Sequence, residues 1–447
     1  MRSFAWSPSI WPAALCLLLS TIPGHAAPST TLGAPGRTNA TPSIAADGPF
    51  VAVVWGGAEP DGTTDVFLAV SRDAGRTFGA PRRVNDTIGD ARLNGEQPPQ
   101  VALVHRASVD PAIVVVWTTK GKNGTTLRQS RSEDGGKTFS AAATVPGTDA
   151  PGNRGWEAIA VGPDGRVDVI WLDHRELASD SAMASSHHDH TQRASGDKAR
   201  LPDSKPDGVA MAQKSKLYFA SLDGTAAPRA VTGGVCYCCK TALVSAVGGW
   251  VYAAWRHVYP GNLRDMAFTM SRDSGRSFVP PIRVSEDHWV LEGCPDDGPA
   301  MAVDAGGRIH LVWPTLVKES GAPGAEPAET IALFYAVSSD GRTFSRRQPI
   351  PTEGLPHHPR IVSGADGNLT VVWDELVKGS RRVAFARARA ASNGVPSFRR
   401  QLLTPDGPSV YPVVAAAGAD VIVAWTSGTS AAASIRIERI SGSGEGR

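Results

Sequence analysis

The sequence has almost no net charge and only one long apolar run. Its 45 lysines and arginines nearly cancel 43 aspartates and glutamates, which leaves a formal net charge of +2. Proteins that bind nucleic acid or anionic membranes carry a basic surface, so we expect neither partner here. After residue 27 no segment approaches the roughly eighteen apolar residues that a membrane-spanning helix needs. We therefore predict a chain with no nucleic-acid partner and no membrane span, and we predict a monomer.

Cysteine is also scarce, with five residues in 447, and one of them, Cys16, lies in the N-terminal apolar run. Residues 1–27 combine Arg2, that apolar run and the small-residue ending Gly24–Ala27, a pattern typical of a secretory signal peptide. The heavy use of Ala, Arg, Gly and Pro is typical of bacteria. We predict export to the periplasm or the medium, with residues 28–447 forming a single domain.

A short turn sequence recurs four times, the last copy being one residue shorter: Ser71–Phe78, Ser132–Phe139, Ser271–Phe278 and Ser338–Phe344. Each copy lies between two extended stretches, so we expect hairpin turns. The aspartate can accept N–H bonds within the turn, a glycine can adopt positive φ and the final phenylalanine can pack under the loop. These aspartates are predicted to be structural and not catalytic: Asp73, Asp134, Asp273 and Asp340.

A second repeat is an apolar run that ends in tryptophan and occurs seven times, at Trp55, Trp117, Trp171, Trp255, Trp313, Trp373 and Trp425. The intervals of 62, 54, 84, 58, 60 and 52 residues suit four-stranded propeller blades, with an insertion at about 176–214. Residues 32–39 resemble 78–85, an expected outermost strand, and can complete the last blade. The sequence therefore predicts an all-β fold, a seven-bladed β-propeller closed by its N-terminal strand.

The recurring turns resemble the Asp-box, or BNR, repeats of the sialidase superfamily. That resemblance implies a propeller, with a six-bladed sialidase-type ring as the alternative, and it implies no particular activity, because such turns occur in enzymes and non-enzymes. The segments Cys236–Leu243 and Cys294–Pro299, with Arg264 and Asp265, resemble exported bacterial sialidase-like propellers that carry a CxCC cluster and a CPxxGP loop. The simplest interpretation of Arg264 and Asp265 is an ion pair with each other.

Every cysteine after the leader falls in loops expected on one face of the ring: Cys236, Cys238, Cys239 and Cys294. One interpretation is disulfide bonding in an oxidising compartment, with Cys294 joined to one of the other three. The other is a soft-metal site that adds imidazoles from His174, His257, His357 or His358. Thiolates and imidazoles suit zinc or copper(I), so these are the candidate cofactors, although no cofactor is certain.

The insertion at about 176–214 is polar and lacks periodicity, so we expect a loop over the same face. The simplest interpretation is a solvated connection. Its histidines, His187, His188 and His190, lie near Met183 and could instead capture copper or zinc and pass it inward.

A sialidase needs three arginines for the substrate carboxylate, a tyrosine nucleophile activated by a glutamate, and an aspartic acid. The Arg-Ile-Pro signature of that family is absent, since residues 40–44 read Ala-Thr-Pro-Ser-Ile. The candidates for such chemistry are Arg154, Arg256, Arg360, Tyr259, Glu157 and Asp173.

We therefore expect a binding protein for a small ligand, a glycan or an exported protein partner, with a soft metal ion as one candidate ligand of the Cys/His face. A glycoside hydrolase of sialidase-like type is the alternative. Whether the chain is an enzyme is left open by the sequence.

Overall fold

The computed structural model describes residues 29–177, 208–291, 295–319, 328–389, 396–404, 407–429 and 432–442. The predicted signal peptide, Cys294 and the insertion histidines His187, His188 and His190 lie outside these residues. Within the described part of the chain, no helix has both the length and the apolar character needed to cross a membrane.

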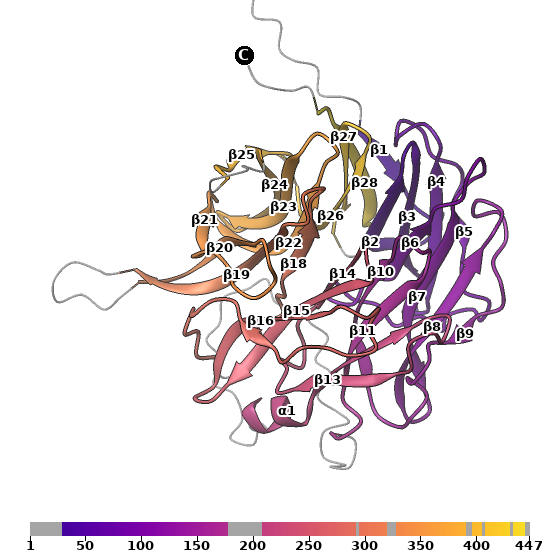
Figure 1. Ribbon diagram of the computed structural model, residues 1–447. Helices are drawn as coiled ribbons and strands as arrows, with labels where there is room; N and C mark the ends of the chain where they lie inside the picture. Colours follow the sequence, from indigo (N-terminus) through magenta and orange to yellow (C-terminus); the bar gives the residue numbers. More distant parts are fainter. Residues whose placement is uncertain are drawn as a thin grey trace, which may run out of the picture.

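Seven four-stranded antiparallel sheets are arranged in a ring, and we number them as blades 1 to 7 (Figure 1). Blade 1 contains β2 (Thr38–Asp47), β3 (Phe50–Ala58), β4 (Thr64–Ser71) and β5 (Arg82–Arg83). Blade 2 contains β6 (Gln100–Val104), β7 (Ala112–Gly121), β8 (Gly124–Ser132) and β9 (Ala143–Thr144). Blade 3 contains β10 (Arg154–Val161), β11 (Val167–Asp173), β12 (Lys216–Ser221) and β13 (Arg229–Gly233).

Blade 4 contains β14 (Ala242–Ala246), β15 (Trp250–Tyr259), β16 (Leu263–Ser271) and β17 (Ile282–Arg283). Blade 5 contains β18 (Ala300–Val303), β19 (Ile309–Glu319), β20 (Ala328–Ser338) and β21 (Gln348–Ile350). Blade 6 contains β22 (Leu355–Ser363), β23 (Asn368–Val377), β24 (Ser380–Arg389) and β25 (Arg399–Leu402). Blade 7 contains β26 (Ser409–Ala417), β27 (Asp420–Ser427), β28 (Ser434–Ile440) and, from the other end of the chain, β1 (Thr30–Leu32).

The ring closes through the pairing of β1 with β28, in which Thr30 lies opposite Ile437 and Leu32 opposite Ile435. The innermost strand of each blade contacts the innermost strands of both neighbouring blades around the full circle. The predicted seven-bladed propeller with N-terminal closure is therefore confirmed, and the six-bladed alternative is wrong. Closure also removes two sheet edges that would otherwise expose unpaired backbone groups.

The recurring tryptophan lies on the second strand of every blade and fills the space between blades. All seven side chains are at least 97% buried: Trp55, Trp117, Trp171, Trp255, Trp313, Trp373 and Trp425. Each belongs to an apolar cluster that includes residues of the preceding blade, as when Trp55 packs with Ile422 of blade 7. Burial of such large rings between sheets accounts for the unbroken apolar runs that precede them.

The four recurring turns connect the third and fourth strands of blades 1, 2, 4 and 5. In the first, Asp73 Oδ1 accepts the N–H groups of Arg76 and Thr77 at 3.0 and 2.9 Å, and Ser71 Oγ accepts the N–H of Gly75 at 2.9 Å. The other three aspartates accept backbone N–H groups in the same way. In the third turn, hydrogen bonds led by the Ser277 hydroxyl lower the pKa of Asp273 to about 2.

Each turn also reaches into the preceding blade. The ring of Phe278 meets that of Phe219 of blade 3, and Phe344 meets Phe268 of blade 4, both with centroids 5.1 Å apart. These rings are half-buried at blade boundaries, as is Phe78 in the first turn. Truncation of Phe78 is therefore expected to cost less than the about 3–5 kcal/mol of a fully buried phenylalanine.

One helix, α1 (Gly208–Lys214), lies at the end of the predicted insertion, where the sequence indicated a loop. Ala212 is fully buried in the apolar cluster of blades 3 and 4, and Ser215 N bonds to Met211 O at 3.0 Å. Tertiary packing of one apolar side chain thus stabilises a helix too short to be recognised from periodicity.

The glycine of the third turn allows a test of this inter-blade contact. Gly275 has φ +80°, and a Cβ there would lie 2.1 Å from the Phe219 ring. Gly275→Ala should lower the free energy of unfolding by about 2–5 kcal/mol, combining left-handed strain with overpacking. Gly379→Ala is the matched control, because Gly379 has the same φ of +80° with no atom within 4 Å of the added Cβ. If denaturant unfolding gives the two variants equal losses of unfolding free energy, the third turn does not pack closely against blade 3.

Candidate functional site

The innermost strands begin at one end of the ring, which we call the entry face, and the recurring turns lie at the opposite end. Four innermost strands carry a β-bulge near this start, at Ala40–Ser43, Gly155–Ala158, His357–Arg360 and Val410–Val413. Each bulge holds one residue at positive φ: Thr41 (57°), Trp156 (54°), His358 (52°) and Tyr411 (54°). Left-handed backbone is strained by about 1–2 kcal/mol for such residues, and bulges of this kind re-aim side chains next to functional sites.

Glu96 of blade 2 connects three blades at the entry face. An Asx turn holds it in place, since Asn94 Oδ1 accepts the N–H groups of Glu96 and Gln97 at 2.9 and 3.0 Å. Its Oε2 accepts the backbone N–H of Lys240 of blade 4 at 3.2 Å, and its Oε1 lies 3.6 Å from Nε2 of His358 of blade 6. The Glu96 carboxylate therefore contacts a backbone N–H of blade 4 and a side chain of blade 6, which are far apart in the sequence.

His358 is bonded on its other side to Asp374, with 2.6 Å between Nδ1 and Oδ1, and Arg381 also pairs with that carboxylate. Burial opposes ionisation of Asp374, but His358 and Arg381 hold its pKa well below the usual range. The Tyr411 ring lies 4.3 Å from the imidazole of His358. It also passes so close to Gly95 that a Cβ there would lie 1.8 Å from it.

A second pair joins blades 5 and 6. His357 Nδ1 lies 2.8 Å from Asp297 Oδ2, and the backbone N–H of His358 donates to Asp297 Oδ1 at 2.9 Å. Burial opposes ionisation here too, yet the bond with His357 lowers the pKa of Asp297. Burial lowers the pKa of His357, but the bond with Asp297 outweighs this effect and raises it. The contact therefore favours a protonated His357 and an ionised Asp297.

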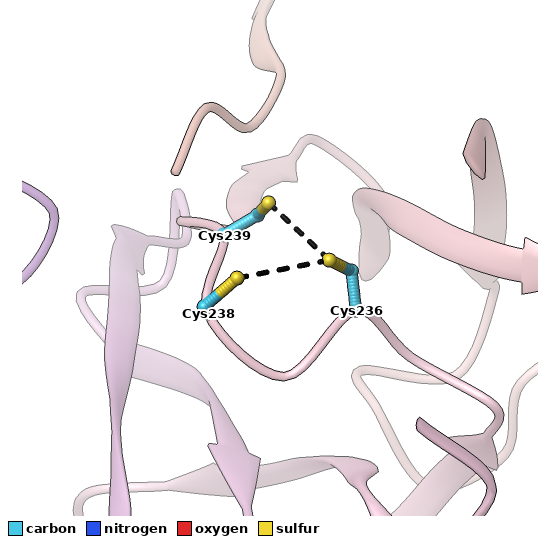
Figure 2. A group of neighbouring side chains, drawn as sticks. All are labelled: Cys236, Cys238 and Cys239. Atoms are coloured by element: carbon cyan, nitrogen blue, oxygen red, sulfur yellow. Dashed lines mark hydrogen bonds between the residues drawn. The ribbon is translucent and has the colours of Figure 1, made fainter. Parts of the chain in front are cut away.

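Three sulfur atoms gather in the segment just before Lys240, and Figure 2 shows their side chains. The Sγ atoms of Cys236, Cys238 and Cys239 all lie within 4.8 Å of one another, with the side chains turned toward a common centre. Cys236 Sγ is 3.5 Å from Cys239 Sγ and 3.9 Å from Cys238 Sγ. All three are buried, and Cys236 and Cys239 are free thiols.

The two free thiols have opposite acid strengths. The thiol of Cys239 donates to Cys236 Sγ, and Arg264 donates from Nη1 to the same sulfur at 3.2 Å. The Cys239 bond, with the nearby charges of Arg264 and Arg256, lowers the pKa of Cys236 to about 6 against the effect of burial. Burial and the bond to Cys236 raise the pKa of Cys239 well above its usual value. The pair therefore favours a thiolate on Cys236 and a protonated thiol on Cys239.

Two carboxyl groups near this face, the half-buried Asp296 and the buried Glu157, retain protons more strongly than usual. Burial, with the charges of Glu96, Cys236 and Asp297, raises the pKa of Asp296 to about 7. Burial also raises the pKa of Glu157 to about 7, although Thr118 Oγ1 donates to it at 3.2 Å.

The residues proposed from the sialidase pattern have mainly internal partners. Arg154 bonds to Asp173 at 3.1 Å and to the carbonyl groups of residues 150–152. Arg256 bonds to the carbonyl oxygens of residues 264, 297 and 314. Tyr259 lies under the guanidinium of Arg283, and burial raises its pKa to about 12. Arg360 is the exception, as it has no hydrogen bond or ion pair among the described residues.

The histidines proposed as metal ligands occupy other environments. No imidazole joins the three sulfurs in a metal-sized group within the described residues. The His174 ring packs against that of Trp156 with centroids 5.4 Å apart and an interplanar angle of 48°. Burial lowers the pKa of His257, which contacts Tyr259, to about 4. His357 and His358 bond to Asp297 and Asp374 as described above. Cys294, the fourth proposed cysteine, is outside the described residues.

Sequence reasoning missed several residues of this face. Asp265 pairs with Arg283 and not with Arg264, which turns to Cys236. Lys240 and Tyr411 were not singled out. Proline was an available signal, because it directly follows the positive-φ residue in three of the four bulges, as in Tyr411-Pro412, and proline within a strand often marks a bulge.

No protein-family model matches the sequence, and none of the curated proteins does. Solved structures do match. An ulvan lyase of polysaccharide lyase family 25 is 10% identical over 93% of this chain and 96% of its own, with a TM-score of 0.53. An α-L-arabinofuranosidase of Fusarium graminearum is 10% identical over 94% of this chain and 98% of its own, with a TM-score of 0.50. A Hadza microbial sialidase is 12% identical over 85% and 73%, with a TM-score of 0.44.

The likenesses to the lyase and the arabinofuranosidase show the fold alone. Activity has to be argued from the residues of this chain.

The raised pKa of Glu157 predicts a pH-dependent stability. The carboxyl has a pKa of 4.5 when unperturbed and about 7 in the fold, so folding is progressively disfavoured as pH rises from 4.5 to 7. Glu157→Gln cannot ionise. The quantity to compare is the free energy of unfolding of Glu157→Gln minus that of the wild type. This difference should be about 3 kcal/mol larger above pH 7 than at pH 4. Urea unfolding across this range measures the difference, with Glu286→Gln, at an exposed position, as control. A pH-independent difference would contradict the assignment.

Proposed function

We propose that this chain is a binding protein for a monovalent soft metal ion, copper(I), held between Cys236 and Cys239. The observation that carries the proposal is a pair of free, buried thiols with sulfurs 3.5 Å apart, one of them hydrogen-bonded to a buried guanidinium. Soft thiolates select copper(I) and zinc over hard ions such as magnesium and calcium.

The protonation state of the pair prepares it for a metal ion. Arg264 is fully buried and donates to Cys236 Sγ, which favours the thiolate form that binds metals. Copper(I) would bond to this thiolate and displace the proton of Cys239 to solvent, forming a bis-thiolate complex. The Cys238 sulfur lies nearby at 3.9 Å, but it is disulfide-bonded and is not a ligand in the proposal.

Ligand number and charge favour copper(I) over zinc. Structural zinc takes four ligands, and the described residues place no histidine or carboxylate with the sulfurs. Two thiolates with a monovalent ion carry a net charge of −1, which the guanidinium of Arg264 offsets. With zinc the same unit would be neutral and would leave that buried cation uncompensated, which is unfavourable.

The glycoside hydrolase alternative has less support from the site. Of the three arginines considered for a substrate carboxylate, Arg154 and Arg256 are bonded to groups of the protein itself. The lyase, arabinofuranosidase and sialidase named above share only the fold with this chain. We also propose that the chain is exported to an oxidising bacterial compartment. This part of the proposal depends on the N-terminal sequence alone.

Copper(I) titration tests the proposal. Anaerobic competition with a chromophoric copper(I) chelator should find one tightly bound ion per reduced chain. Cys236→Ser and Cys239→Ser should each weaken binding by about a hundredfold or more, because loss of a ligand exceeds the 10–100-fold effect of outer-shell partners. Arg264→Met, which removes such a partner, should fall within that 10–100-fold range.

Met270→Leu is the matched control, because it removes a buried sulfur of the same blade and leaves the thiols intact. It and Cys238→Ser should retain wild-type stoichiometry. Retention of wild-type copper affinity in Cys236→Ser or Cys239→Ser, with the fold intact by circular dichroism, contradicts the proposal.

A further inference from the structure

The three cysteines just before Lys240 are in two chemical states. Cys236 and Cys239 are free thiols, whereas Cys238, which lies between them in the sequence, is disulfide-bonded. The sulfur to which Cys238 is bonded is outside the described residues, and the disulfide interpretation of the sequence names Cys294 as its partner. A disulfide and two free thiols therefore share one buried loop.

The free thiol of Cys236 lies beside the disulfide sulfur of Cys238. The two Sγ atoms are 3.9 Å apart, and both side chains point toward the centre of the loop (Figure 2). An extended strand would separate residues two positions apart by roughly 6–7 Å. Here the backbone turns at Tyr237 and Cys238, which brings the two sulfurs together.

The surroundings of Cys236 favour a nucleophile. Its Sγ accepts hydrogen bonds from the Cys239 thiol at 3.5 Å and from Arg264 Nη1 at 3.2 Å, and both bonds favour the thiolate. The thiolate is the form that attacks a disulfide.

Cys239 is less well placed for the same attack. Its own thiol is the donor in the bond to Cys236. It also directly follows Cys238, and the Cα atoms of sequence neighbours are about 3.8 Å apart, below the roughly 4.4–6.8 Å that disulfides usually span. Of the two free thiols, Cys236 is therefore the one positioned to react with Cys238.

Burial favours a reaction within the chain over a reaction with another protein. The exposed fractions of Cys236, Cys238 and Cys239 are 1%, 6% and 2%. A disulfide of another protein would have to reach a covered sulfur, whereas the Cys238 disulfide is already beside it. Reacting groups held together in this way react as a unimolecular step.

We propose that Cys236 is the nucleophile of a thiol–disulfide exchange at the Cys238 disulfide. The Cys236 thiolate forms a bond to Cys238 Sγ, the existing S–S bond of Cys238 breaks, and its former partner leaves as a thiolate with the bonding electron pair. One disulfide and one thiolate are present before and after this step, so it needs no oxidant or reductant. The disulfide thus has two positions, and Cys239 is a thiol in both.

The exchange would control the copper site. A sulfur in a disulfide is no longer a thiolate, the form that ligates metals, so the exchange removes one of the two ligands proposed for copper(I). This consequence rests on the proposed function, whereas the exchange itself does not.

Trapping of free thiols in the metal-free protein tests the exchange. The native protein is incubated with iodoacetamide for hours, the timescale of uncatalysed disulfide rearrangement, and the remaining thiols are then blocked with N-ethylmaleimide under acidic, denaturing conditions. Because Cys236 is buried, it should react slowly with iodoacetamide, which leaves time for the exchange.

Peptide mapping without reduction reads the result. Chymotrypsin cleaves after Tyr237, so the peptides that carry Cys236 and Cys238 stay joined only if a disulfide links these two residues. Mass spectrometry should find this joined pair in the wild type, with the former partner of Cys238 alkylated. If Cys238 keeps its original disulfide in every molecule, the proposal is overturned without recourse to any variant.

Two matched variants, each lacking one free thiol, assign the nucleophile. Cys239→Ser should give the joined pair at the wild-type yield, because the serine hydroxyl can still donate to Cys236 Sγ. In Cys236→Ser, Cys238 should keep its original disulfide in every molecule. Loss of the joined pair in a folded Cys239→Ser, or a bond between Cys238 and Cys239 in Cys236→Ser, would contradict the assignment to Cys236.

Copper(I) titration of the trapped isomer separates this proposal from the copper proposal. The isomer with the Cys236–Cys238 disulfide should bind copper(I) about a hundredfold or more weakly than the protein with both thiols free, as predicted for Cys236→Ser. Exchange in a wild type that does not bind copper(I) would support the exchange and overturn the copper proposal. Equal copper(I) affinity of the two isomers would contradict control of the copper site by the exchange.

Discussion

Closure of the ring is the constraint on which the rest of the structure depends. Three residues at the N-terminal end of the described chain, β1, pair with β28 and complete blade 7, so that every innermost strand has a neighbour on each side. Only in a closed ring can Glu96 of blade 2 touch both Lys240 of blade 4 and His358 of blade 6, which are 144 and 262 positions away in the sequence. The entry face is therefore a property of the whole circle and of no single blade.

The two ends of the ring differ in how their polar groups are satisfied. At the turn end, Asp73 and its three counterparts accept N–H groups within their own turns, and the aromatic rings pack on the preceding blade. At the entry face, by contrast, strained backbone at His358 and Tyr411 occurs together with a pair of buried free thiols. Strained backbone and perturbed pKa values concentrated at one end are typical of a binding site, while the other end supplies stability.

Much of the fold could be predicted because it is repeated. The tryptophan intervals specified the number of blades, and the similarity of residues 32–39 to 78–85 indicated closure by the N-terminus. The site was less predictable, because its contacts depend on which blades face each other. Nothing local distinguishes Arg256, whose guanidinium is saturated by carbonyl oxygens, from Arg360, which has no hydrogen bond or ion pair with a described residue. Arg264 was expected to pair with its sequence neighbour Asp265, but Arg283 on the next strand takes that carboxylate and leaves Arg264 to Cys236.

The central claim is that the closed ring forms a soft-metal site from two thiols at one end of its axis. The most direct measurement is anomalous diffraction at the copper absorption edge from crystals of the reduced protein loaded with copper(I). The account predicts one strong peak between Cys236 Sγ and Cys239 Sγ, with Arg264 still directed at the former. A peak elsewhere with none between these sulfurs, or an ordered site without copper, would contradict it.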